Sequence, residues 1–571
     1  MTQTLPVPSP WVIHPRSQPA LALDLARSLG APPAIGHVLV NRGLADLAAV
    51  GEFLHPTIDA LHDPFLLLDL DRAVERIERA LAGGERVLVQ GDYDVDGITS
   101  TYLLTTALTE LGGRIETRIP HRTRDGYGLT VAAVDEAERR RCTLIVTVDC
   151  GIMAVEAVAE ARRRGIDTVI TDHHEPAARL PDAAAVVNPR RPGCPYPFKS
   201  LAGVGVTFKL VEALFLRRGN RARTEGFLEI VALGTIADVV PLVRENRVLA
   251  ALGLDRLHRT RHLGLRALLE RDGLAGRRLT SGQVAFVLAP RINAAGRMGN
   301  AEQALRLLMA RDEDEARACA ESLEDDNDRR RSFDEQAAAD AAARVEAELD
   351  WPRCASILMW SDTWHAGVLG IVASRLVERF QRPTMLVALD GDRGRGSGRS
   401  LGGLDLTRVL DGCADLLEAY GGHALAAGLT VHRDRLPELR ERFEKLVAER
   451  VDLAQLARPL EIDADVAVGD CGDALVDWTE RLAPHGLDNP EPVLRVARAE
   501  VLSVGTAAGG KHLRLVVREG TAVAEAIGFG MGAEIAGGRR ARTCAVAFAP
   551  IRDRWNGATR IQLKLKGVRW S

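Results

Sequence analysis

The sequence has no C-x-x-C pair among its eight cysteines, which are scattered along its 571 residues. Paired cysteines hold zinc ribbons, and closely spaced even sets of cysteines build disulfide frameworks. Their absence argues against both kinds of stabilisation and is typical of a protein of the reducing cytoplasm, which is the location that we expect.

Long apolar segments are missing as well. The N-terminal MTQTLPVPSPWVIHP has no basic stretch followed by an apolar one, so it does not resemble a signal peptide. No apolar run is long enough to span a bilayer, and we expect no membrane contact. The formal net charge of −4 does not indicate a nucleic-acid-binding protein. It does not exclude one, because the placement of the basic residues decides this.

The length of the chain predicts two to four domains, since one hydrophobic core does not grow to this size. Short β-branched runs at 86–90, 143–148 and 167–171 alternate with amphipathic segments at 97–111 and 154–165. This alternation predicts a parallel sheet with helices on its faces. Ligands of such sheets bind at the carboxyl ends of the strands.

The rest of the chain divides into three further regions. Residues 200–310 are predicted to be mainly helical, with a break at 288–300. Residues 313–349 contain no helix breaker and predict one helix about 55 Å long. A linker between domains is its favoured role, and a coiled coil is less favoured because a sustained apolar seam is missing. A second α/β unit follows at about 353–452, and short alternating segments from about 456 predict a small β-barrel or sandwich.

Each predicted strand of the first unit runs into acidic residues or histidines: GDYDVDG, VDCG and TDHHE. On an extended segment, Asp92, Asp94 and Asp96 would point the same way, and a divalent cation would relieve their repulsion. Oxygen-rich sites with one or two imidazoles suit Mg²⁺ or Mn²⁺. The alternative is a solvated acidic turn in which Asp96 or Thr99 caps a helix.

The other motifs add candidate ligands. Asp149 ends one predicted strand, and a single aspartate there is usually a helix cap. Asp172, His173 and His174 end the next strand, and two adjacent histidines beside an acid are better ligand candidates. Asp238 lies within an apolar segment, where a charge must be paired or bound to metal if it is buried. Together these residues predict a site for two metal ions.

These motifs resemble those of a known superfamily. GDYDVDG, VDCG, TDHH and GTIADVVPL are similar to the four motifs of the DHH phosphoesterases. WHAGVLGIVASR (364–375), RGSGRS (395–400) and GGHALAAG (421–428) resemble the associated DHHA1 domain. LAPHGLDNPEP (482–492), GGKHLRLVV (509–517) and RDRWNG (552–557) resemble the OB-type domain of the RecJ exonuclease family. Three further segments make the resemblance to this family more specific: IPHRTRDGYGL (119–129), LAGVGVTFKL (201–210) and LAPRINAAGRM (288–298). The resemblance covers about residues 70–571.

The resemblance implies a domain organisation. An N-terminal segment (1–70) would pack on a DHH catalytic domain (71–312). A linker helix (313–352), a DHHA1 substrate-binding domain (353–453) and an OB-fold-like nucleic-acid-binding domain (454–571) would follow.

The resemblance also implies a role for each site residue. Asp94 and Asp149 would hold one ion, and Asp96, Asp149, His173 and Asp238 the other. His174 would face the scissile phosphate, while Asp92 and Asp172 would orient their neighbours or assist catalysis. Related pyrophosphatases have a histidine where this chain has Gln90, which leaves the first ion with fewer protein ligands.

Phosphate contacts are implied in two places. Residues 353–400 contain seven arginines and four acids, a local excess of three positive charges. Small residues beside arginine let the backbone approach a phosphate closely. For an isolated arginine a solvated loop is the more usual role, and the resemblance favours Ser397, Gly398, Arg399 and His423 as contacts. Motif position suggests Arg122, Arg124 and Arg297 for a terminal phosphate.

The function implied is a two-metal-dependent exonuclease that degrades single-stranded DNA from its 5′ end and releases 5′-mononucleotides. Only the resemblance implies this polarity, and it also implies a single-strand-binding protein and a helicase as partners. With aromatic residues at 4% of the chain, we expect binding through the DNA backbone that weakens with salt. The alternatives are a nanoRNase or nucleotide phosphatase of the same superfamily, and a catalytically inactive DNA-binding scaffold.

Overall fold

The computed structural model describes residues 10–122, 124–350, 353–451, 459–538, 541–553 and 560–571. Residues 554–557, in the RDRWNG motif, therefore lie outside the described residues. The chain forms two compact units. The larger unit comprises Val12–Ala320 and Glu461–Ser571, and the smaller one comprises Met1–Trp11 and Glu321–Leu460.

A five-stranded parallel sheet forms the centre of the DHH domain in the larger unit, in the order β3-β2-β4-β5-β6. The predicted strands 86–90 and 167–171 coincide with β2 and β5. The strands β3 and β6 were not predicted. The five are β2 (Arg86–Gln90), β3 (Arg114–Arg118), β4 (Leu144–Val148), β5 (Asp167–Thr171) and β6 (Ala185–Val187).

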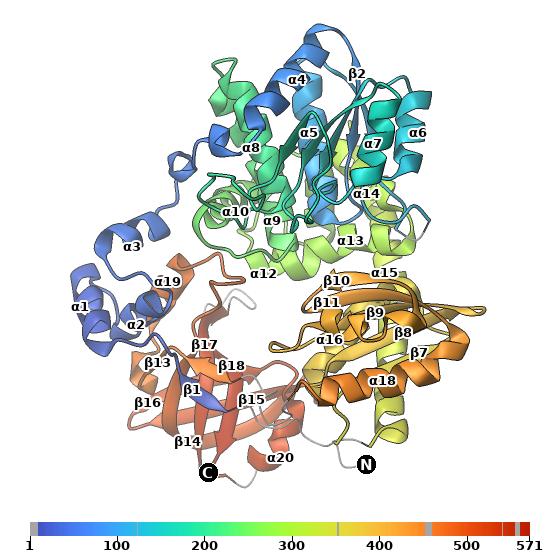
Figure 1. Ribbon diagram of the computed structural model, residues 1–571. Helices are drawn as coiled ribbons and strands as arrows, with labels where there is room; N and C mark the ends of the chain where they lie inside the picture. Colours follow the sequence, from blue (N-terminus) through green and yellow to red (C-terminus); the bar gives the residue numbers. More distant parts are fainter. Residues whose placement is uncertain (1–9, 123, 351–352, 452–458, 539–540, 554–559) are drawn as a thin grey trace. The chain divides into compact units, whose positions relative to one another are not determined.

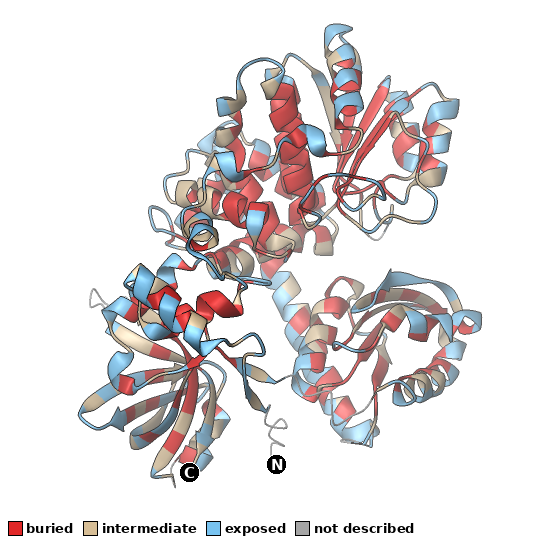
Figure 2. Cartoon of the chain, turned by 60° about the vertical axis from the view of Figure 1, so that its left-hand side comes forward, coloured by how far each residue is buried: buried red, intermediate tan, exposed pale blue. Residues whose placement is uncertain are grey.

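Helices cover both faces of this sheet (Figure 1). Val87 and Val89 point into one core with α4 (Leu70–Ala82), α5 (Val95–Glu110) and α8 (Gly203–Leu216). Leu88 points to the opposite face, into a core with α6 (Val131–Arg139) and α7 (Val155–Arg163). Because both faces are covered, the strands β2, β4 and β5 are largely apolar and buried, and Figure 2 shows buried strands in this sheet.

The DHH domain continues with helices. The expected break within 288–300 lies at Gly299, the left-handed residue that ends α13. Pro290 does not break the helix, because it stands in the first turn of α13, where a helix needs no N–H group. A π-helical turn, η4, precedes α13. These elements are η3 (Arg221–Phe227), α9 (Leu228–Ala237), α10 (Arg244–Leu257), α11 (Leu263–Arg271), α12 (Ser281–Gln283), η4 (Val284–Leu288), α13 (Ala289–Met298) and α14 (Ala301–Met309).

A closed β-barrel ends the chain, as the alternating segments predicted. Its order is β14-β15-β16-β18-β17, and β14 pairs with β17 to close it. The parallel strand β13 and helix α19 flank it. The elements are β13 (Ala464–Asp465), α19 (Asp473–Arg481), β14 (Leu494–Ala507), β15 (His512–Glu519), β16 (Ala522–Gly528), α20 (Ile535–Gly538), β17 (Thr543–Asp553) and β18 (Arg560–Trp570).

The described part of the N-terminal segment is divided between two cores. Residues Leu61 and Leu67 belong to the core of the parallel sheet. In contrast, α1 (Pro19–Leu29), α2 (Pro33–Asn41) and α3 (Leu47–Leu54) share the core of the barrel. Packing of the whole segment 1–70 on the DHH domain was too simple an expectation, because the apolar faces of these helices complete the barrel core.

The smaller unit contains the mixed sheet of the DHHA1 domain, ordered β10-β11-β9-β8-β7 and parallel only between β7 and β8. The segment RGSGRS belongs largely to strand β9 rather than to a loop. The predicted linker helix is α15, within which the two units divide. The elements are α15 (Glu313–Glu348), β7 (Ile357–Ser361), α16 (Leu369–Phe380), β8 (Thr384–Asp390), β9 (Arg393–Arg399), α17 (Leu406–Asp411), β10 (Leu417–His423), β11 (Ala426–His432) and α18 (Leu436–Ala448).

Among the described residues, no helix combines the length and the apolar character that crossing a membrane requires.

Candidate metal centre and nucleic-acid contacts

The acidic motifs meet at the carboxyl edge of the parallel sheet. Asp92 follows β2, Asp149 follows β4, and His173 follows β5, so adjacent strands bring them together. Asp238 reaches the same place from the C-terminal end of α9. The sequence thus placed the site at the correct edge of the fold.

Two details of the predicted geometry are wrong. Asp94 is the N-cap of α5 and accepts a hydrogen bond from the Gly97 N–H, and Asp96 lies in the first turn of that helix. The three acids of GDYDVDG therefore do not share one extended segment. Alternation along a strand would turn the adjacent His173 and His174 to opposite faces, but both residues lie beyond the last residue of β5.

Three carboxylates surround the imidazole of His173. Its Nε2 lies 3.1 Å from Asp149 Oδ1, 3.7 Å from Asp238 Oδ2 and 3.9 Å from Asp96 Oδ2. Burial and the neighbouring His174 lower the pKa of His173 to about 3. The ring is therefore neutral at pH 7, which is the form that binds metal ions.

Three overlapping groups of side chains have ligand atoms within 4.8 Å of one another. Asp149 belongs to two of them, as does His173. One group contains Asp92 and Asp94, and another contains Asp96 and Asp238. The groups are Asp92–Asp94–Asp149, Asp96–His173–Asp238 and Asp149–His173–His174.

The electrostatics of these acids fit divalent cations. Burial, followed by the charge of Asp94, raises the pKa of Asp96 to about 7. Burial and neighbouring carboxylates also raise the pKa values of Asp92, Asp149 and Asp238 well above the usual range. Moreover, Asp92 Oδ1 and Asp238 Oδ2 are buried without a hydrogen-bond partner. Cations would satisfy these oxygens and favour ionisation, and the carboxylate–imidazole set suits Mn²⁺ or Mg²⁺.

The first residues of α8 contact two acids of the cluster, Asp96 and Asp149. The N–H groups of Gly203 and Val204 donate to Asp96 Oδ2 and Oδ1, both at 2.7 Å. A Cβ on Gly203 would lie 2.3 Å from Asp149 Oδ1, so only glycine fits there. The sequence motif LAGVGV contained this signal, although the role of its backbone was not predicted.

Backbone strain is found at two site positions. Asp149 has φ 58°, and Val239, which follows Asp238, has φ 60°. The left-handed region is unfavourable for a β-branched residue and persists only where the surroundings enforce it. Such strain is common at functional sites and here fixes the direction of two acids.

Asp172 serves mainly to orient its neighbours. It is fully buried, and its Oδ1 accepts hydrogen bonds from the main-chain N–H groups of His173 and His174, at 2.7 and 3.1 Å. The same oxygen lies 2.7 Å from His174 Nδ1. Burial alone would lower the pKa of His174, but this bond and the charge of Asp172 outweigh it and raise the pKa.

Tyr127 is a residue of the site that the sequence reasoning missed, although it lies in the quoted segment 119–129. Its hydroxyl oxygen is 3.1 Å from His174 Nδ1 and 3.3 Å from the main-chain oxygen of Asp149. Tyr127 and Asp172 therefore both contact Nδ1 of the His174 ring.

Gln90 occupies the position at which related pyrophosphatases have a histidine. Its amide donates to the Gly91 carbonyl oxygen at 2.8 Å and accepts from Arg118 at 3.2 Å. Arg118 also bonds to Asp125, which accepts from the His121 N–H. Gln90 thus belongs to the network that positions the loop after β3.

Two of the three predicted arginines act on the side chain of Tyr93. The Arg122 guanidinium lies 4.9 Å from the centre of the Tyr93 ring, and the charges of Arg122 and Arg297 both act on that phenol. Arg124 is largely exposed and pairs with Asp125 at 2.8 Å. Arg122 and Arg297 are therefore the better placed pair.

In the smaller unit, the predicted phosphate contacts gather at one end of the mixed sheet. Arg399 on β9 and His423 on β10 are both level with Ala426 on β11. Arg399 lies 3.4 Å from Ser397 Oγ and donates to the Gly398 carbonyl oxygen at 2.8 Å.

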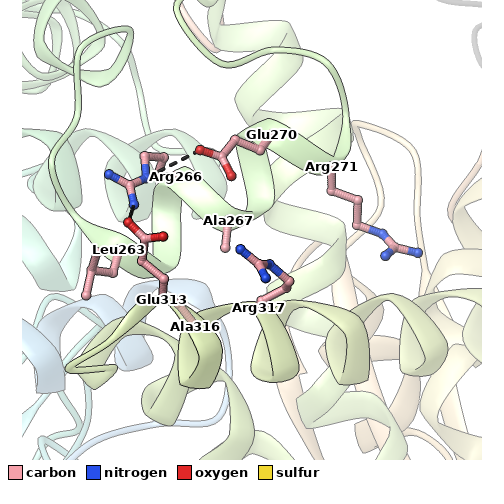
Figure 3. A pocket seen from close by; sticks show the side chains of 8 residues that line it. All are labelled: Leu263, Arg266, Ala267, Glu270, Arg271, Glu313, Ala316 and Arg317. Atoms are coloured by element: carbon pink, nitrogen blue, oxygen red, sulfur yellow. Dashed lines mark hydrogen bonds and ion pairs between the residues drawn. The ribbon is translucent and has the colours of Figure 1, made fainter.

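A separate pocket of about 220 Å³ lies between α11 and the start of α15 (Figure 3). Arg266 pairs with Glu270 and Glu313 at its wall, and Arg317 points into it. None of the candidate metal ligands lines this pocket. It is therefore not part of the metal centre.

Comparison with known proteins identifies the domains. The DHH family N-terminal domain matches residues 86–235, the DHHA1 domain matches 354–449, and the RecJ OB domain matches 462–567. The single-stranded-DNA-specific exonuclease RecJ of Bacillus subtilis is 36% identical over 95% of this chain and 69% of its own length. The RecJ of Dickeya dadantii is 38% identical over 88% of this chain and 89% of its own. The chain belongs to the RecJ family.

Solved RecJ structures agree with this assignment. RecJ of Thermus thermophilus in complex with Mn²⁺ has a TM-score of 0.84 at 30% identity, over 98% of this chain and 80% of that one. The same protein in complex with Mg²⁺ has a TM-score of 0.78 at 29% identity, over 98% and 78%. The RecJ relatives thus bind the two metals that suit the donor set of the present chain.

Proposed function

We propose that this chain is a metal-dependent exonuclease that degrades single-stranded DNA from 5′ to 3′ and releases 5′-mononucleotides in DNA repair and recombination. The observation that carries the proposal is the pair of ligand groups that share Asp149. Membership of the RecJ family supports the substrate and the reaction.

Two Mn²⁺ or Mg²⁺ ions are the proposed cofactors. Asp94 and Asp149, assisted by Asp92, would hold one ion. The other would be held by Asp96, Asp149, His173 and Asp238. Paired ions supply a nucleophile at neutral pH and neutralise charge on the attacking and leaving oxygens.

His174 is the proposed proton donor to the scissile phosphodiester. Its raised pKa favours the protonated imidazolium, and Asp172 and Tyr127 fix the direction of the ring. An imidazolium in a fixed orientation can donate to a phosphate oxygen or to the leaving oxygen. Asp172 and Tyr127 act through His174 and are positioning residues.

Phosphate binding by both units would set the register of the strand. We propose that Arg122 and Arg297, with Arg124 in a lesser role, bind a terminal phosphate in the larger unit. Ser397, Gly398, Arg399 and His423 are the proposed contacts in the smaller one. Charge-assisted hydrogen bonds from arginine to phosphate are strong and directional. The barrel would bind the strand further from its end.

The remaining assignments rest on the family alone. They are a single-strand-binding protein and a helicase as partners. The cytoplasm, as the proposed location, rests instead on the scattered cysteines. A nanoRNase or phosphatase of the same superfamily is less favoured, because dinucleotides need no OB domain and the RecJ OB domain matches here.

One experiment tests the proposal. The protein with Mn²⁺ is given single strands, duplexes and dinucleotides of DNA and RNA, each 5′-phosphorylated and labelled at one end. Mononucleotide release from the 5′ end of single-stranded DNA is expected. Cleavage of dinucleotides alone would indicate the nanoRNase, and binding without cleavage would indicate an inactive scaffold.

A further inference from the structure

An arginine beside the metal centre has no role in the reaction described above. Arg190 follows β6, the strand next to β5, and lies two residues beyond the fully buried Asn188. Asn188 Nδ2 donates to the main-chain oxygen of His174 at 2.9 Å, and Asn188 Oδ1 accepts from the Arg190 N–H at 2.8 Å. The backbone of Arg190 is therefore tied through one side chain to that of His174.

The charge of Arg190 acts on the metal centre. It is among the causes that lower the pKa of His173, and it counters the rise in the pKa of Asp238. Its side chain is 36% exposed, so the guanidinium is accessible to an incoming phosphate.

The partner of Arg190 is replaceable. Arg190 Nη1 lies 3.3 Å from Glu175 Oε2, and the Glu175 side chain is 67% exposed. An exposed pair of this kind contributes about 0–1 kcal/mol, whereas arginine binds phosphate through paired, charge-assisted bonds. A phosphate that arrived at the rim would therefore compete well with Glu175.

We propose that Arg190 is a substrate-binding residue that exchanges Glu175 for a backbone phosphate of the DNA strand adjacent to the scissile phosphodiester. Glu175 is then an anionic competitor at the rim, which weakens binding as long as Arg190 is present. This inference rests on the proposed exonuclease function. It adds one phosphate contact on the side of the centre formed by β5 and β6.

The test compares Arg190→Gln, Arg190→Lys, Glu175→Gln and the double variant Arg190→Gln/Glu175→Gln. Arg179→Gln is the control, because Arg179 is an exposed arginine on the β5–β6 loop that also carries Glu175. KM, kcat and their salt dependence are measured on 5′-phosphorylated single-stranded DNA with Mn²⁺, and Mn²⁺ affinity is measured by calorimetry.

Arg190→Gln is expected to raise KM about tenfold, which corresponds to one charge-assisted hydrogen bond, with kcat and Mn²⁺ affinity within about twofold. The slope of log(kcat/KM) against log salt should fall by about 0.7, the value for one phosphate contact on a single strand. Arg190→Lys should recover part of the loss. Glu175→Gln should lower KM about threefold, and the double variant should match Arg190→Gln.

Three results would overturn the inference. The first is an Arg190→Gln variant that equals Arg179→Gln in KM and salt slope. The second is a fall in kcat or in Mn²⁺ affinity without a change in KM, which would make Arg190 a positioning group of the metal centre. The third is a double variant whose KM is lower than that of Arg190→Gln, which would show that Glu175→Gln acts on KM independently of Arg190. A wild-type protein that cleaves no single-stranded DNA would instead refute the proposed function itself.

Discussion

Metal binding by this protein should be strongly pH-dependent near neutrality, because buried acids that hold protons must release them to bind a cation. Asp96 is the best-defined case, since burial and the charge of Asp94 raise its pKa to about 7. His173, with a pKa lowered to about 3, does not titrate in this range. Mn²⁺ affinity should therefore fall as the pH falls through 7.

The magnitude follows from the position of this pKa. A single group that titrates at about 7 is mostly ionised at pH 8 and mostly protonated at pH 6, so Asp96 alone accounts for about a tenfold loss of affinity between them. The stability of the metal-free protein depends on pH in the opposite direction to the Mn²⁺ affinity. The folded state binds this proton more tightly than the unfolded state, so stability falls as the pH rises from about 4 to 7, by about 4 kcal/mol for Asp96.

Calorimetric titration of Mn²⁺ at pH 6, 7 and 8, in buffers of different ionisation enthalpy, gives the affinity and the number of protons released. At least one proton should be released at pH 6 and fewer at pH 8. The control Asp182→Asn, which changes an exposed acid, should leave the pH dependence of Mn²⁺ affinity unchanged. Asp96→Asn should release one proton fewer on binding Mn²⁺ at pH 6. His174→Gln separates the contribution of the His174 imidazole, whose pKa is also raised. Equal affinity at pH 6 and 8, or no proton release at pH 6, would refute the reasoning.

Three further predictions concern single residues. Asp149→Ala, which removes the carboxylate shared by two ligand groups, should lower kcat at least about 1000-fold and leave the DNA dissociation constant within about threefold, as a binding assay in EDTA would show. Arg247→Met should cost about 3 kcal/mol in urea unfolding, because buried Arg247 donates to backbone carbonyls and stacks 3.7 Å from the Phe53 ring centre. Tyr127→Phe should lower kcat about tenfold with little change in KM, because it frees the His174 ring; an unchanged kcat would remove Tyr127 from the positioning residues.

The sequence predicted those elements whose burial is uniform. Strands β2, β4 and β5 are covered on both faces and read as unbroken apolar runs, which have no other common explanation at that length. Strand β3 was missed because it lies at the sheet edge and reads RIETR, with mixed burial. Strand β6 has only three residues. The glycine-rich β9 was not predicted as a strand, since glycine is rare in strand interiors.

The N-terminal helices show a different limit. Their apolar faces are visible in the sequence, but an apolar face does not name its partner. Long-range contacts such as Asn41 to Asp463, at 2.9 Å, and Arg42 to Asn489, at 2.8 Å, join residues more than 400 positions apart. Such pairs leave no local pattern, and the choice between the DHH domain and the barrel could not be made from the sequence.

The metal ligands could be predicted from the sequence for a physical reason. That reason does not apply to the groups that hydrogen-bond to the ligands and orient them. Several carboxylates at the ends of buried strands would repel one another and lose hydration on folding, so their presence in the sequence itself implies a cation that offsets both costs. The groups that hold them are neutral: the N–H groups of Gly203 and Val204, the Asn188 amide and the Tyr127 hydroxyl. Neutral hydrogen-bond donors are stable in many surroundings, so their presence in a sequence does not indicate a metal site. A sequence therefore reveals the ligands of a buried cation more readily than the groups that aim them.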